Sequence, residues 1–63
     1  MDDNEIRKLR PGDNIITKTG LWKVLSNDPE KKMVAYAVMY SKGGDITYDQ
    51  LADVEQLGHG EEI

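Results

Sequence analysis

Few side chains in this sequence could carry chemistry. His59 is the sole imidazole and cysteine is absent, so a metal site would have to combine His59 with Glu61 and Glu62. Zinc sites draw most of their ligands from several His and Cys side chains. A nucleophilic triad would need Ser26 or Ser41, both in predicted loops, together with that same histidine. The sequence therefore predicts no catalytic residues, no metal site and no cofactor.

Two further patterns resemble parts of active sites. Asp45 and Asp49 flank one predicted strand and could share a face, but we expect no apolar cleft around them that would support general acid–base chemistry. Gly43 and Gly44 are predicted to form a loop and not a phosphate-binding loop, because no Lys-Ser/Thr pair follows and Asp45 would repel phosphate. We therefore expect that the protein is not an enzyme.

The aromatic residues are the strongest candidates for binding. In a chain without phenylalanine, Trp22, Tyr36, Tyr40 and Tyr48 must supply much of the core, so packing is the first interpretation for each. The alternative is contact with a protein partner, because Trp and Tyr dominate the energetics of protein interfaces. Tyr40, at the end of an apolar strand, is the first candidate for such a contact.

Charge is segregated along the chain, although the formal net charge is only −4. The first five and the last eleven residues carry seven acidic and no basic side chains, whereas residues 6–52 carry all eight Lys and Arg against five acids. We interpret residues 1–5 and 59–63 as flexible acidic ends that help to keep a small protein soluble. The body between them is mildly basic.

A basic body suggests a second kind of partner. Cations beside a tyrosine hold single-stranded nucleic acid, and the side chains that could do so are Lys23 and Lys42, with Lys18, Lys31, Lys32, Arg7 and Arg10. Against this stands the isoelectric point of about 4.7, far below that of typical nucleic-acid-binding domains. Weak nucleic-acid binding is therefore the alternative to protein binding.

The turns and strands predict one small, mainly β domain over residues 6–58. Pro11 and Gly12 suit the central positions of a type II turn at residues 10–13. Strands are expected over 14–18, 21–26 and 33–40, followed by a hairpin loop at 41–45 and a fourth strand at Ile46 and Tyr48, where the period of two resumes. Residues 33–40 are apolar on both faces, which predicts a long, central, bent strand. If one side of that strand is unpaired, another chain could add there and give a weak homodimer.

The segment from 47 to 58 allows two structures. Thr47 and Gln50 fit a capping box, which favours a helix over 48–57 packed on an antiparallel sheet. A four-stranded sheet, however, would leave an exposed apolar face and two bare edges. We therefore favour a single helical turn at residues 49–51 followed by a fifth strand over 52–57.

The order of these segments resembles a small SH3-like β-barrel. The resemblance is carried by Pro-Gly-Asp at 11–13, Gly-Leu-Trp-Lys-Val-Leu at 20–25 and Gly-Gly-Asp-Ile-Thr-Tyr-Asp-Gln-Leu at 43–51, and it covers residues 9–58. It implies five strands and a short helical turn before the last strand. The Ala-Leu-Tyr-Asp-Tyr run of signalling SH3 domains and the second glycine of the KOW motif are missing, so neither a proline-rich ligand nor RNA binding is implied.

Taken together, these features predict a non-enzymatic binding module or accessory protein of a bacterium or its phage. The absence of cysteine fits a reducing compartment such as the cytoplasm. The longest apolar stretch, at 33–40, is too short to span a membrane, so no membrane is expected. A protein partner is expected first and nucleic acid second, with the chain itself a monomer or weak homodimer.

Overall fold

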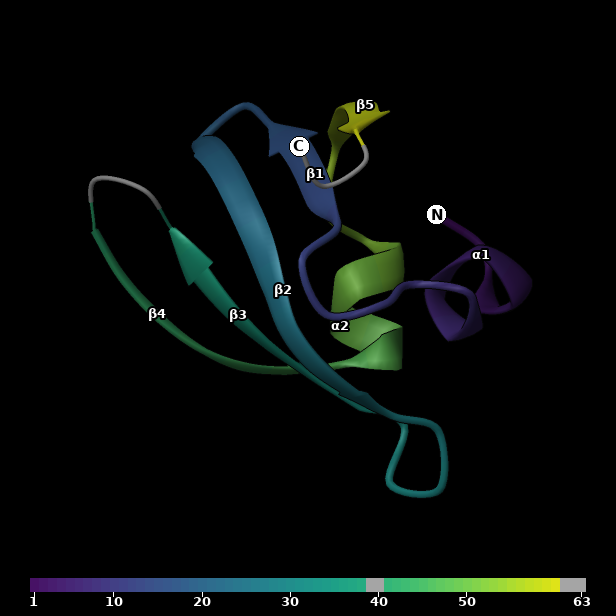
Figure 1. Ribbon diagram of the computed structural model, residues 1–63. Coiled ribbons are helices and arrows are strands. Elements are labelled where there is room, and N and C mark those ends of the chain that lie inside the picture. The colour runs from purple at the N-terminus through teal and green to yellow at the C-terminus, as the bar shows by residue number, and fades with distance from the viewer. Residues whose placement is uncertain (39–40, 61–63) are drawn as a thin grey trace.

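The protein is mainly β, with five antiparallel strands in one open sheet (Figure 1). The computed structural model describes residues 1–38 and 41–60. In these residues the elements are α1 (Asp3–Arg7), β1 (Asn14–Thr17), β2 (Gly20–Asp28), β3 (Met33–Val38), β4 (Ser41–Thr47), α2 (Tyr48–Ala52) and β5 (Gln56–Gly60). The strand order is β4-β3-β2-β1-β5, so β4 and β5 form the two ends of the sheet. The five strands and the short helix before the last one are confirmed, whereas a closed barrel is not seen among the described residues.

The predicted turn at residues 10–13 is present and fixes the start of the sheet. The Asp13 amide donates to the Arg10 carbonyl at 3.0 Å, and Gly12 has the positive φ of 97° that a type II turn requires at its third position. Gly12 and Asp13 also exchange backbone hydrogen bonds of 2.8 Å with Val24. These hydrogen bonds hold the turn against β2 just before β1 begins.

β3 is the strand for which an unpaired side was considered. It is paired on both sides, with β2 and with β4. The described part of it ends at Val38, so the predicted extension to 40 lies outside the described residues. β2 is the strand at the middle of the sheet, and its pairing with β3 contains a bulge between Val24 and Ser26. A bulge bends a strand, and this one gives β2 the curvature visible in Figure 1.

The expectation of a hairpin loop at 41–45 is wrong, because these residues lie in β4. The register of β4 against β3 shifts between Tyr36 and Val38, and Gly43 lies at this irregularity. A Cβ on Gly43 would stand 2.0 Å from the Tyr36 carbonyl oxygen, so only glycine lets the two backbones approach this closely. The glycine pair therefore serves backbone contact within a strand, and not the chain reversal that its local sequence suggests.

The last segment follows the favoured alternative with a shifted boundary. Helix α2 has only five residues and begins with the predicted capping box of Thr47 and Gln50, so the helix over 48–57 is wrong. The strand predicted over 52–57 instead spans Gln56–Gly60. The shift arises because the amides of Asp53 and Val54 still donate to carbonyls of α2, at 3.2 and 3.1 Å, and pairing with β1 starts only after them.

The N-terminal helix α1 was not predicted. Asp2 caps it by accepting a hydrogen bond of 2.8 Å from the Glu5 amide. Ile6 and Leu9, three residues apart, are buried, and Met1 packs against the core. Ordered structure therefore extends beyond the predicted unit of 6–58 at both ends, from Asp3 in α1 to Gly60 in β5.

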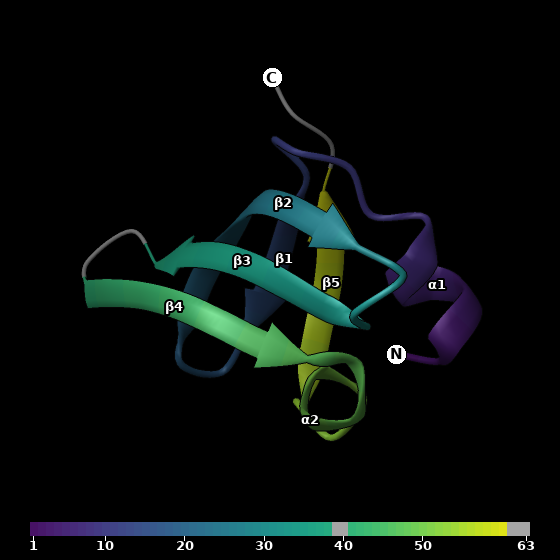
Figure 2. The ribbon, with the colours of Figure 1, turned by 90° about the horizontal axis from the view of Figure 1, so that it is seen from below.

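The core lies between the curved sheet and the two helices. In Figure 2, α2 lies below the sheet and α1 to one side, while β1 and β5 cross behind β2, β3 and β4. The buried apolar residues come from both helices and from three strands: Ile6, Leu9, Ile15, Val24, Val34, Tyr48 and Leu51. Burial of these side chains is the main force that holds the short helices on the sheet, since helices of five residues are not stable alone.

Candidate functional site

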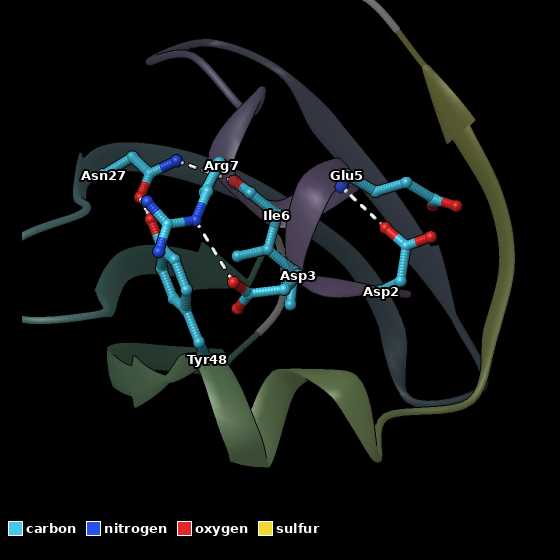
Figure 3. Close-up of polar contacts among 7 residues, drawn as sticks. All are labelled: Asp2, Asp3, Glu5, Ile6, Arg7, Asn27 and Tyr48. Carbon is cyan, nitrogen blue, oxygen red and sulfur yellow. Dashed lines mark hydrogen bonds and ion pairs between the residues drawn. The ribbon is translucent and has the colours of Figure 1, made fainter.

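Tyr48, one of the predicted binding residues, belongs to the core and joins both helices to the sheet. Its hydroxyl donates to Asn27 Oδ1, and Asn27 Nδ2 donates to the carbonyl oxygen of Ile6 at 2.8 Å (Figure 3). Asn27 Nδ2 also donates to the carbonyl oxygen of Leu9 at 3.0 Å. Tyr48 is only 2% exposed. The Tyr48 side chain is therefore packed in the core.

Burial also gives Tyr48 a pH dependence. Desolvation raises the pKa of its hydroxyl above the usual 10.0, against smaller lowering effects of Arg7 and of the Asn27 hydrogen bond. A group whose pKa is higher in the folded than in the unfolded state stabilises the fold at pH values below the unfolded pKa. This stabilisation is lost as the pH rises through the folded pKa. We expect the free energy of unfolding to fall above pH 10.0 more steeply in the native protein than in Tyr48→Phe. Urea unfolding followed by circular dichroism checks this, with Tyr36→Phe as control, and parallel pH profiles for native protein and Tyr48→Phe would contradict it.

Trp22 and Tyr36 are brought together by the structure. Their rings stack with centroids 4.3 Å apart and planes 13° apart, and both residues are half-buried. Their strand register explains the contact, because Trp22 pairs with Val38 and Val24 pairs with Tyr36, which sets the two rings diagonally on one face. The buried Trp22 Nε1 has no hydrogen-bond partner among the described residues.

The remaining predicted site residues are not assembled around this stack. Lys23 directly follows Trp22 in β2, so it lies on the opposite face of the sheet, where it is exposed. Lys42 is exposed on β4, and Tyr40 lies outside the described residues. The structure thus joins Trp22 with Tyr36 and separates Lys23 from both.

The basic side chains are dispersed in the described part of the chain. Lys18 lies in the turn before β2 and forms an ion pair with Glu55 at 2.9 Å, while Lys31 and Lys32 lie in the turn after it, at the other end of a nine-residue strand. Arg7 pairs with Asp3 at 3.1 Å. Lys18 and Arg7 are thus in ion pairs, and Lys31 and Lys32 line one groove with Tyr48 at the other end of β2.

Exposed apolar side chains form the feature that the sequence analysis missed. Ile16, Leu25 and Leu57 are 43%, 54% and 63% exposed. Ile16 pairs with Leu21 on β2 and with Gly58 on β5. We call Ile16, Leu21, Leu57 and Gly58 the β1–β5 corner. The alternation of β2 already predicts that Leu21 and Leu25 lie opposite Trp22, whereas only the pairing of β5 with β1 puts Leu57 on the strand next to Ile16.

Gly58 leaves room for the Ile16 side chain at this corner. A Cβ added there would stand 3.4 Å from Ile16 Cδ1, so the isoleucine side chain covers the glycine. Leu57 has no partner in the register of β1, which passes from Gly58 opposite Ile16 to Gln56 opposite Thr17. This irregularity leaves the Leu57 side chain in solvent.

A shallow groove lies between β5 and the N-terminal segment. It has a volume of about 180 Å³ and is lined by Met1, Glu5, Lys8 and Leu9 from the N-terminal segment and by His59 from β5. His59, expected in a flexible tail, therefore lies in a strand opposite Ile15.

No group of three or more His, Asp or Glu side chains within residues 1–38 and 41–60 is placed to hold a metal ion. In the same residues, no helix has the length and apolar character needed to cross a membrane. Comparisons with protein-family models, with curated proteins and with solved structures gave no match.

Proposed function

We propose that the protein is a non-enzymatic protein-binding module in which a small SH3-like sheet presents the β1–β5 corner to a partner. The observation that carries the proposal is the exposure of Ile16 and Leu57 on neighbouring strands. Single exposed apolar residues are common on protein surfaces, but neighbouring ones mark interfaces.

The composition makes this exposure costly to the fold. The chain has only 14 Leu, Ile and Val residues, yet three of them, Ile16, Leu25 and Leu57, lie in solvent. Full burial of one such side chain is worth about 1.5–3 kcal/mol. A partner that covers the corner would recover this energy, whereas folding of the isolated chain does not.

A cytoplasmic setting is part of the proposal, supported by the absence of cysteine. Nucleic-acid binding is not proposed as a second function, because Lys18 and Arg7 are engaged in ion pairs and Lys31 and Lys32 lie at the far end of β2.

A photo-crosslinking amino acid at position 57 tests the proposal in the cells that produce the protein. We expect a discrete crosslinked protein, and we expect Ile16→Ser to reduce its yield about tenfold, since loss of an interface anchor costs more than 1 kcal/mol. Lys42→Ser, on the opposite edge of the sheet, is the matched control and should leave the yield unchanged.

Both variants alter exposed side chains, so equal unfolding midpoints are the check that the fold is intact. Recovery of RNA or DNA in place of protein, or equal yields from Ile16→Ser and the unaltered residue 16, would refute the proposal.

A further inference from the structure

The free edge of β5 is open to another strand. β5 pairs with β1, and no other described strand pairs with its second edge, so alternate backbone amides and carbonyls there lack a strand partner. Protein edges are normally protected by Lys, Pro or inward charges, and Gln56–Gly60 contains none of these. The opposite edge, β4, carries Lys42 and Asp45 as well as the irregularity at Gly43.

The groove between α1 and β5 offers a surface for the side chains of an added strand. Figure 2 shows α1 beside β5, and the groove between them is lined by apolar Met1 and Leu9 with the polar Glu5, Lys8 and His59. Side chains of a strand alternate between two faces. One face of a strand added to β5 would therefore meet Met1 and Leu9, and the other would continue the β1–β5 corner.

The charge around this groove selects the partner. The fold brings the N-terminal segment and β5 together, because both line the same groove. Residues 1–8 and 53–60 together carry five side-chain carboxylates and two basic side chains. Asp3 is paired with Arg7 and Glu55 with Lys18, which leaves Asp2, Glu5 and Asp53 against Lys8. Complementary charge speeds association and excludes like-charged partners. A second copy of this chain would bring two acid-rich sets together, whereas a basic segment would be attracted.

We propose that β5 accepts a basic, extended segment of a partner protein as an additional strand of the sheet. This rests on the proposed function and names its binding mode. Backbone hydrogen bonds along Gln56–Gly60 supply affinity, and alternate apolar side chains of the segment occupy the groove and the corner. Its lysines or arginines face the unpaired carboxylates within residues 1–8 and 53–60.

A synthetic peptide of alternating lysine and valine is the probe. We expect it to bind in fluorescence anisotropy and to slow hydrogen exchange of the β5 amides but not of the β4 amides. The same peptide with alternate backbone nitrogens methylated keeps its charge but loses the amide donors of one edge. We expect about tenfold weaker binding, because these amides can no longer donate to the carbonyls of β5. A glutamate–valine peptide should not bind.

Two variants of the protein complete the test. His59→Lys puts a positive charge on β5 and should weaken peptide binding about tenfold, while Asp45→Lys puts the same charge on β4 and should not.

Equal binding of the methylated peptide, or protection of β4 in place of β5, would overturn strand addition. Protection of β5 without peptide, with a doubled mass in sedimentation, would assign the edge to a second copy. If the peptide does not bind but the crosslink at position 57 still depends on Ile16, the binding mode is wrong and the proposed function stands.

Discussion

Asn27→Ala is expected to lower the free energy of unfolding by about 3 kcal/mol, since it removes three hydrogen bonds worth about 1 kcal/mol each. The amide accepts from the Tyr48 hydroxyl and donates to the carbonyls of Ile6 and Leu9, so its loss separates both helices from β2. A domain of this size has a total stability of about 3–9 kcal/mol at typical values per residue. The variant should therefore lose at least about a third of the total stability, as measured by urea denaturation.

The control for Asn27 is Tyr48→Phe, which removes only the hydroxyl. We expect it to cost about 1 kcal/mol, and the double variant to cost less than the two single changes added together, because the residues share one bond. A smaller effect of Asn27→Ala than of Tyr48→Phe would show that the amide does not hold α1 to the sheet.

Gly43→Ala should destabilise the protein by about 3 kcal/mol, at the upper end of the range for overpacking. The new Cβ would stand 2.0 Å from the carbonyl oxygen of Tyr36 and 2.5 Å from the Cα of Ala37. Both are backbone atoms of the paired strand, so β3 and β4 must move apart to admit it. Thermal unfolding followed by circular dichroism measures the loss.

The neighbouring glycine provides a matched control. A Cβ on Gly44 would meet nothing within 4 Å, so Gly44→Ala should change the stability by less than about 0.5 kcal/mol. Similar losses from Gly43→Ala and Gly44→Ala would mean that the strand conformation, and not the close approach at Gly43, decides the need for glycine.

Signals contained within a few residues were predictable from the sequence. The turn at Pro11 and Gly12 and the capping box of Thr47 and Gln50 depend on local geometry, and both are present. The prediction of a loop at Gly43 was wrong because this glycine is required by the close approach of Tyr36, a residue on another strand. Helix α1 was missed although Asp2 with Glu5 three residues on is a local capping signal, because five residues form a stable helix only when Ile6 is buried by distant elements.

The candidate site was less predictable for the same reason. Residue type indicated that Tyr48 would pack or bind, and only the position of Asn27 decides that it packs. Leu57 was expected at the end of the last strand, and it is exposed because the pairing of β1 with β5 passes over it. Strand register therefore determines the surface, and register is set by distant partners.

The shared groove of Met1 and His59 has a practical consequence for labelling. An affinity tag or fluorescent protein fused to either terminus would sit beside β5 and compete with any ligand there. The four exposed residues 29–32, between β2 and β3, offer an insertion point elsewhere in the sequence. A reporter inserted between β2 and β3 leaves both termini of the chain free when ligands of β5 are screened.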